Sequence, residues 1–164
     1  MNKSNLSNNL YGFADLKTLN EIGPLIINRA KGIYVYDINQ KKYLDANSGL
    51  WNSVAGFDHQ GLIETAIDQY KKFASYHSLF GRISDKAIQL SEKIIEISPF
   101  ESGKVFFTNS GSEANDTAVK ILWMFHKRNG QPKKRKIITR INAYHGVTLG
   151  AGSMTGKPYI EEFG

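Results

Sequence analysis

Apolar and polar positions alternate on both sides of the polar stretch INQKK near the start of the chain. A period of two indicates half-buried β-strands, and two such runs around a polar turn predict a β-hairpin from about Gly32 to Asn47. The stretch LWNSVAGFDHQG that follows has no regular period, so we expect it to be irregular.

Three later segments carry apolar residues at the three-to-four-residue spacing of an α-helix. The first helix is predicted over residues 61–73. The second starts after Ser84, a typical N-cap residue, and ends before Pro99; the third follows Ser110. Their apolar stripes are, in chain order, Leu62, Ile63, Ala66, Ile67 and Tyr70; Ala87, Leu90, Ile94 and Ile97; and Ala114, Ala118, Ile121, Leu122 and Phe125.

Two short apolar runs, KVFFT and KIITRI, flank the third helix and are predicted to be buried strands. The order strand, helix, strand between Lys104 and Ile141 is that of a βαβ unit, in which the strands are parallel and the crossover is right-handed. The sequence therefore predicts an α/β fold, with the hairpin outside this sheet.

The four residues Asn109, Ser110, Gly111 and Ser112 join the first of these strands to the third helix. One interpretation is a capping box, in which the Ser110 hydroxyl and the Glu113 carboxylate bind each other's backbone N–H groups. The other is a phosphate site, because a loop that opens a helix after a parallel strand offers free N–H groups and the positive end of the helix dipole. Local chemistry leaves both interpretations open.

The second strand ends in Ala143, Tyr144, His145 and Gly146, which we expect at the same edge of the sheet. An aromatic ring at this place can stack on a planar ligand. The alternative is that Tyr144 is an aromatic residue at the edge of the core and that His145 is a hydrogen-bonded turn residue.

Composition narrows the possible functions. The chain has no cysteine, so it can form neither a disulfide nor a thiolate metal site, and its four histidines show no short ligand spacing. No stretch is long and apolar enough to span a membrane, and no secretory signal is evident, so we expect a cytoplasmic protein. The net charge of +6 includes one basic run at residues 133–136. We interpret that run as a solvated loop and do not expect nucleic acid as a partner.

The segments SGSEANDTAVK and RINAYHG, together with the upstream GIYVYDINQKKYLDANSGLWNSVAGFDHQ, resemble the class III (ω) aminotransferases. The resemblance covers nearly the whole chain. It implies the fold type I of enzymes that depend on pyridoxal 5′-phosphate (PLP), with a hairpin segment over residues 1–60. It also implies that residues 61–164 form the first part of a mainly parallel, incomplete large-domain sheet.

The resemblance also implies roles for single residues. Ser110, Gly111 and Ser112 match the loop that binds the cofactor phosphate. Tyr144 matches the aromatic residue that stacks on the pyridine ring, with His145 beside it.

Two further residues match positions near the substrate, since Trp51 corresponds to an aromatic residue that lines the pocket and Phe80 to a loop close to the active site. The reaction implied is transfer of an amino group from an amine or ω-amino acid to a keto acid such as pyruvate, in a homodimer.

The Schiff-base lysine of this family lies downstream of the motifs found here, and we expect none of the lysines in the chain to replace it. Lys120, Lys133, Lys134 and Lys136 lie away from the predicted site, and nothing orients Lys157. The chain is therefore expected to be an N-terminal fragment that is inactive alone. A non-enzymatic phosphate- or nucleotide-binding module is the alternative, although no Lys follows the glycine as in a nucleotide phosphate loop.

Overall fold

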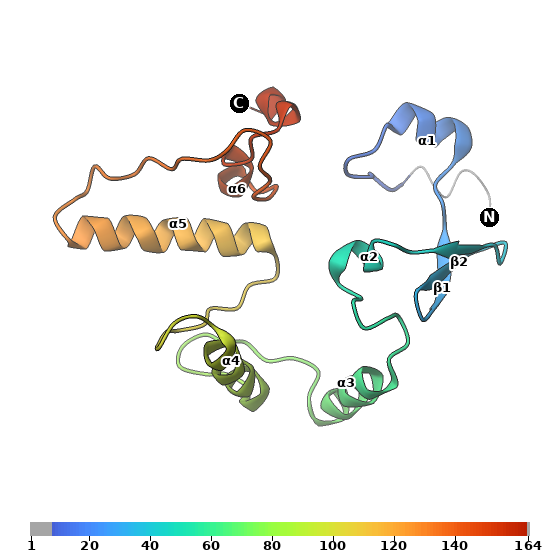
Figure 1. Cartoon of the computed structure of the whole chain (residues 1–164), viewed down its shortest axis with the longest axis horizontal. Coiled ribbons are helices and arrows are strands. Elements are labelled where there is room, and N and C mark those ends of the chain that lie inside the picture. Colours follow the sequence, from blue (N-terminus) through green and yellow to red (C-terminus); the bar gives the residue numbers. More distant parts are fainter. Residues whose placement is uncertain (1–7, 164) are drawn as a thin grey trace. The chain divides into compact units, whose positions relative to one another are not determined.

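The computed structural model describes residues 8–163, which divide into two compact units that meet between Tyr76 and His77. Figure 1 labels the helices α1 to α6 and the strands β1 and β2. The division predicted from the resemblance, into residues 1–60 and 61–164, remains a prediction.

The first unit contains a three-stranded antiparallel sheet in the order β1-β2-β3. Its strands are β1 (Ile27–Lys31), β2 (Tyr34–Asp37) and β3 (Lys42–Leu44). Tyr34 pairs with Leu44 and Val35 with Tyr43, so the predicted hairpin is confirmed. The sequence analysis missed β1, which pairs with β2 through an irregularity between Ile27 and Arg29.

Three helices complete the first unit: α1 (Leu16–Ile22), α2 (Ser48–Trp51) and α3 (Gln60–Lys72). Asp15 caps α1 through its carboxylate, which accepts hydrogen bonds from the N–H groups of Lys17 and Thr18. The helix predicted over residues 61–73 is confirmed as α3, which His59 caps by accepting a bond from the N–H of Leu62.

The second unit contains α4 (Asp85–Ile97), α5 (Gly111–Arg128), α6 (Leu149–Ser153) and the 3₁₀ helix η2 (Pro158–Phe163). Both predicted N-caps are confirmed: the Ser84 hydroxyl accepts a bond from Ala87 N at 3.2 Å, and the Ser110 hydroxyl accepts one from Glu113 N at 3.1 Å. The short helix α6 was not predicted.

The two strands predicted on either side of α5 are not formed among the described residues. The segments 104–108 and 136–141 run without a strand ladder, and neither is buried: Phe106 and Ile138 are exposed, the latter to 96%. A strand forms only when its backbone groups pair with a neighbouring strand, and these two segments have no such pairing among the described residues. The prediction of a buried parallel pair was therefore wrong for this structure.

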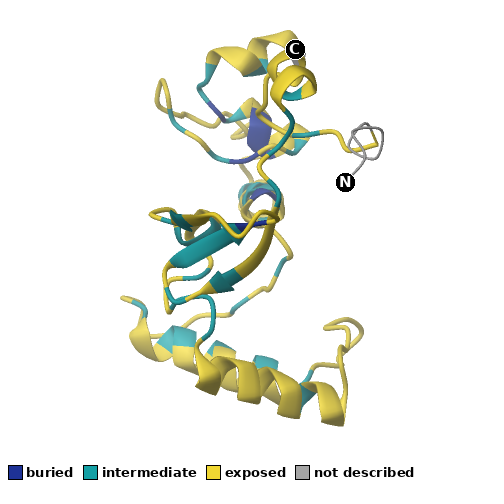
Figure 2. Ribbon diagram, turned by 90° about the vertical axis from the view of Figure 1, so that its right-hand side faces the viewer, coloured by how far each residue is buried: buried dark blue, intermediate teal, exposed yellow. Residues whose placement is uncertain are grey.

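Burial in both units is slight (Figure 2), and Ala151 is the one buried apolar residue within residues 8–163. The apolar stripe predicted for α5 exists, but its large members Ile121, Leu122 and Phe125 are half or more exposed. The covered side of α5 is instead polar at its start, with Ser112 buried and Asn115, Asp116 and Thr117 half-buried. Both units thus leave many large apolar side chains uncovered.

No helix in the described part of the chain combines the length and the apolar character needed to cross a membrane.

Candidate functional site

The start of α5 is closed by a reciprocal cap between Ser110 and Glu113. The Ser110 hydroxyl accepts from the N–H of Glu113 and also lies 3.2 Å from its carboxylate, while that carboxylate accepts from the N–H of Asn109 at 3.0 Å. The charge of Glu113 is therefore turned back onto the cap. Both hydrogen-bonding functions of the Ser110 hydroxyl are used within the chain.

The next two N–H groups, of Gly111 and Ser112, have no acceptor among residues 8–163. They belong to the first turn of an 18-residue helix, whose dipole places partial positive charge there. A Cβ built on Gly111 would meet no heavy atom within 4 Å, and its backbone is not left-handed. Neither packing nor conformation requires glycine at this position, so its effect is to keep the space before these N–H groups open.

Ser112 joins α5 to the loop that contains the second motif. Its side chain is buried, and its Oγ accepts from the backbone N–H of Val147 at 3.0 Å. Gly146, between His145 and Val147, has φ +138°, and a Cβ there would fall 2.8 Å from Ala151 Cβ and 3.0 Å from Ser112 Cα. Glycine at 146 is therefore required by both conformation and close approach.

Two further side chains, those of Asn115 and Thr155, hold the same loop. The Asn115 side-chain amide donates to the carbonyl oxygen of His145 at 2.6 Å. The buried hydroxyl of Thr155 accepts from the His145 N–H at 3.0 Å and lies 3.1 Å from the Gly146 carbonyl oxygen. The carbonyl oxygen of Ala151 lies at 3.2 Å and competes for the same hydroxyl hydrogen, so Thr155 connects the His145–Gly146 backbone to α6. The backbone of the second motif is thus fixed from two sides.

The structure brings the two motifs together, as the sequence analysis expected, although not through paired strands. Tyr144 directly precedes this fixed backbone, and its side chain is 55% exposed. Its hydroxyl has no hydrogen-bond partner in the described part of the chain. Tyr144 is thus exposed, whereas His145 is half-buried.

Trp51 lies in the first unit, whereas Phe80 lies in the second. The Trp51 side chain is 77% exposed, and that of Phe80 is 90% exposed with φ +55°. Their predicted roles at a substrate pocket stay predictions, as do the cofactor roles of Ser110, Gly111, Ser112, Tyr144 and His145.

Trp51 ends an unusual backbone segment that sequence reasoning missed. The four residues of α2, Ser48 to Trp51, have φ values of 49°, 62°, 64° and 72°, so α2 is a left-handed turn. For residues other than glycine this conformation costs about 1–2 kcal/mol each. The local signal for it was Gly49, two residues after Asn47, since glycine and asparagine tolerate positive φ whereas Leu50 and Trp51 rarely adopt it.

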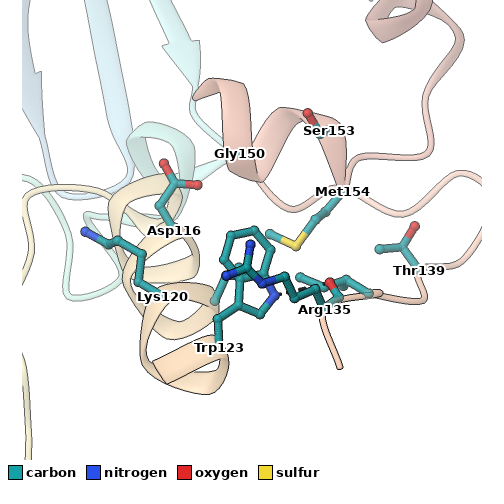
Figure 3. A pocket seen from close by; sticks show the side chains of 10 residues that line it. Asp116, Lys120, Trp123, Arg135, Thr139, Gly150, Ser153 and Met154 are labelled. Carbon is teal, nitrogen blue, oxygen red and sulfur yellow. Dashed lines mark hydrogen bonds between the residues drawn. The ribbon is translucent and has the colours of Figure 1, made fainter. Parts of the chain in front are cut away.

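A separate cavity of about 580 Å³ lies against the side of α5 (Figure 3). Asp116, Lys120 and Trp123 contribute from α5, Gly150, Ser153 and Met154 from α6 and its end, and Arg135 and Thr139 from the extended segment after α5. The Trp123 indole N–H donates to the Arg135 carbonyl oxygen at 3.1 Å, and the Arg135 guanidinium lies 5.5 Å from the indole ring centre. Oδ1 of Asp116 is buried and lacks a hydrogen-bond partner within the described residues.

The cavity contains Lys120, two turns along α5 from the open N–H groups of Gly111 and Ser112. Lys133, Lys134 and Lys136 are exposed in the turn after α5, and Lys157 is half-buried before η2. The expectation that no lysine of this chain serves the cofactor stays a prediction.

The class-III aminotransferase family model matches residues 18–164. Among curated proteins, the chain is 48% identical over 141 residues to gamma aminobutyrate transaminase 2 of Solanum lycopersicum, covering 85% of this chain and 31% of that protein. It is 44% identical over 143 residues to a probable mitochondrial gamma-aminobutyrate transaminase 3 of Oryza sativa, covering 87% of this chain and 28% of that protein. It is 43% identical over 143 residues to vanillin aminotransferase of Capsicum frutescens, covering 87% of this chain and 31% of that protein.

The chain is also similar to solved structures of aminotransferases. A PMP-bound aminotransferase from Vibrio fluvialis is 58% identical with a TM-score of 0.92, over 96% of this chain and 35% of that one. An ω-aminotransferase from Paracoccus denitrificans is 55% identical with a TM-score of 0.94, over 98% of this chain and 36% of that one. The chain thus spans about a third of the length of these proteins.

Proposed function

This chain belongs to the class-III aminotransferase family, and we propose that it carries the part of such an enzyme that holds the phosphate and ring of PLP. The fold type I assignment made from the sequence is confirmed by the solved relatives. Because the chain spans about a third of their length, the activity, substrates and partners of the whole protein belong to this proposal.

The observation that carries the proposal is the open space at Gly111 in front of two N–H groups that lack an acceptor among the described residues. A phosphate there would accept from the N–H groups of Gly111 and Ser112 and would lie at the positive end of α5. The Ser110 hydroxyl donates to Glu113 within the chain, and Ser112 is buried with its Oγ accepting from Val147, so the backbone N–H groups are the main donors. The cap by Glu113 is compatible with this, since its carboxylate is turned onto Asn109 and Ser110.

Tyr144 supplies the second contact. Its exposed ring directly precedes a backbone that Ser112, Asn115 and Thr155 connect to the first turns of α5 and to the end of α6. Stacking of such a ring on a planar heterocycle stabilises the complex by about 0.5–1.5 kcal/mol beyond the burial of area. His145 follows Tyr144 in the sequence and is the last of the residues predicted to bind the cofactor.

When bound, PLP supplies an electron sink that allows an amine to lose a proton and pass on its amino group. The residues of this chain bind and orient the cofactor and do not move that proton. We propose that the complete enzyme transfers an amino group from an amine or ω-amino acid to a keto acid such as pyruvate. A homodimer and a cytoplasmic location are part of the same proposal.

The experiment compares binding of pyridoxamine 5′-phosphate with binding of pyridoxamine, by calorimetry and by the NMR shifts of the Gly111 and Ser112 amides. The amine form is chosen because it forms no Schiff base with surface lysines. Hydrogen bonds to a charged group contribute about 1.5–3 kcal/mol, so the phosphorylated ligand is expected to bind roughly tenfold or more tightly.

Equal affinities for the two ligands, or shifts elsewhere than at the start of α5, would contradict the proposal. ATP serves as a third ligand, and tighter binding of ATP than of pyridoxamine 5′-phosphate would favour the nucleotide-binding alternative. The chain alone is expected to form no alanine from an amine and pyruvate.

A further inference from the structure

The left-handed turn α2 is held by one carboxylate, that of Asp45. Its Oδ1 accepts from the N–H of Asn47 at 2.9 Å, and its Oδ2 accepts from the N–H of Gly49 at 2.8 Å. A single side chain thus binds two N–H groups within the segment that leads into the turn. Both bonds are charge-assisted and are correspondingly strong.

Asp45 is itself attached to the sheet. Its N–H donates to the carbonyl oxygen of Ile33 at 3.0 Å, which extends the β2–β3 pairing by one residue beyond the Tyr34–Leu44 pair. The carboxylate therefore projects from the end of a paired strand. Asp45 therefore connects the turn to the sheet.

The backbone of the turn is tight as well as left-handed. The N–H of Trp51 donates to the Asn47 carbonyl at 2.7 Å, and the N–H of Ser53 donates to the Ser48 carbonyl at 2.8 Å. A Cβ on Gly49 would lie 2.8 Å from Asn52 Oδ1 and 3.3 Å from the Phe57 ring. This conformation is costly for Leu50 and Trp51, and it persists only because other contacts over-determine it.

Trp51 receives little support from its own side chain. The side chain is 77% exposed, and its indole N–H has no partner in the described part of the first unit. The backbone at residues 48–51 sets the direction of the Trp51 Cα–Cβ bond and so the region that the indole can reach.

We propose that Asp45 is a positioning residue, whose carboxylate holds residues 48–51 in the left-handed turn and thereby aims the Trp51 indole in the amine-donor pocket. The second half of this statement rests on the proposed function, because only the resemblance places Trp51 at that pocket. The first half concerns the free chain and can be tested without cofactor or substrate.

The test follows the turn by NMR in the full 164-residue chain. Strong intraresidue HN–Hα NOEs at Leu50 and Trp51 report positive φ, and cross-strand NOEs between Tyr34 and Leu44 report the sheet. A Trp123→Phe background leaves Trp51 as the one tryptophan, so that near-ultraviolet circular dichroism reports the setting of its indole.

Asp45→Ala removes both acceptors, and we expect loss of the two positive-φ NOEs and of the Trp51 dichroism while the sheet NOEs remain. Asp45→Asn keeps one acceptor oxygen and is expected to give intermediate NOEs. Asp15→Ala is the matched control, since Asp15 also accepts from two N–H groups of the same unit, and it should change neither signal.

Retention of both NOEs in Asp45→Ala would overturn the proposal. If that variant also loses the sheet, Asp45→Asn decides: weakened NOEs support the proposal, and NOEs at wild-type strength overturn it. In an active aminotransferase that carries residues 1–164, Asp45→Asn is expected to raise KM for the amine several-fold more than it lowers kcat. If Asp45→Asn weakens the turn but raises KM no more than it lowers kcat, only the role of the turn in the amine-donor pocket is overturned. Failure of the chain to bind pyridoxamine 5′-phosphate would overturn only the proposed function.

Discussion

Oγ of Ser112 accepts a hydrogen bond from the backbone N–H of Val147 at 3.0 Å, across 35 positions of the sequence. This contact joins the first turn of α5 to the loop that carries Tyr144. It explains how two motifs that bind one cofactor in the proposed function are kept together in a unit with almost no apolar core. Polar contacts, rather than buried apolar area, organise this part of the chain.

Gly146→Ala is expected to break the hydrogen bond between Ser112 and Val147. The new Cβ would meet Ser112 Cα at 3.0 Å and Ala151 Cβ at 2.8 Å, at a φ of +138° that alanine rarely adopts. We expect a local destabilisation of about 1–3 kcal/mol, seen as amide exchange at Val147 that is roughly tenfold or more faster. Gly152→Ala is the control, because its Cβ would meet nothing closer than 3.8 Å; equal effects of the two variants would refute the explanation.

Thr155→Val tests the hydroxyl that serves His145 and Gly146. Valine keeps the shape but leaves the N–H of His145 without its acceptor in a buried place, which costs about 1–3 kcal/mol. Amide exchange of His145 should become faster by an order of magnitude or so. Thr155→Ser keeps the hydroxyl and should exchange nearly as slowly as the wild type; a serine variant as fast as the valine variant would show that the methyl group matters instead.

Acid is expected to loosen the β2–β3 connection through Asp37. Burial alone would raise the pKa of this carboxyl, but hydrogen bonds from the Lys41 N–H, the Tyr43 hydroxyl and the Asn39 N–H outweigh it and lower the pKa below its ordinary 3.8. The folded carboxyl therefore binds a proton less readily than the unfolded one. Its stabilising effect is full above the ordinary pKa and is lost as pH falls through the lowered value.

The measurement is an acid titration of the Tyr43 and Lys41 NMR signals. Wild-type signals should lose their folded positions as pH falls below 3.8, whereas Asp37→Asn should show a weakened hairpin already at neutral pH and little further change. Asp68→Asn is the control, since Asp68 forms an ion pair with Lys71 on the surface of α3. The hairpin signals of this variant should respond to acid as those of the wild type do. If the hairpin of Asp37→Asn still responds to acid, a group other than Asp37 causes the response.

The features that the sequence predicted well are those that neighbouring residues decide. The hairpin around INQKK, the Ser84 cap and the Ser110–Glu113 cap all depend on groups a few positions apart, and all are confirmed. A helix cap is a contact between positions N-cap and N3, so its signal is contiguous in the sequence.

The predictions that failed depend on residues that are distant in the sequence. The segments KVFFT and KIITRI have strand composition, but a strand also needs a pairing partner, and the described residues supply none. The burial of Ser112 depends on Val147, and the left-handed turn at Trp51 depends on Asp45 and Gly49 together. The roles of the candidate site residues stay predictions. The sequence pattern assigned the phosphate contacts to serine hydroxyls, whereas the Ser110 hydroxyl is used by the helix cap and the N–H groups of Gly111 and Ser112 lack an acceptor among the described residues.

The affinity of the Gly111→Ala chain for pyridoxamine 5′-phosphate tests the central claim most directly. Alanine at 111 meets no neighbour and needs no left-handed backbone, so α5 and its cap should be as stable as in the wild type, which amide exchange can verify. Gly12→Ala, at another open glycine outside the site, is the control. The account predicts an affinity that falls roughly tenfold or more in Gly111→Ala alone; an unchanged affinity would contradict the assignment of this loop to the cofactor phosphate.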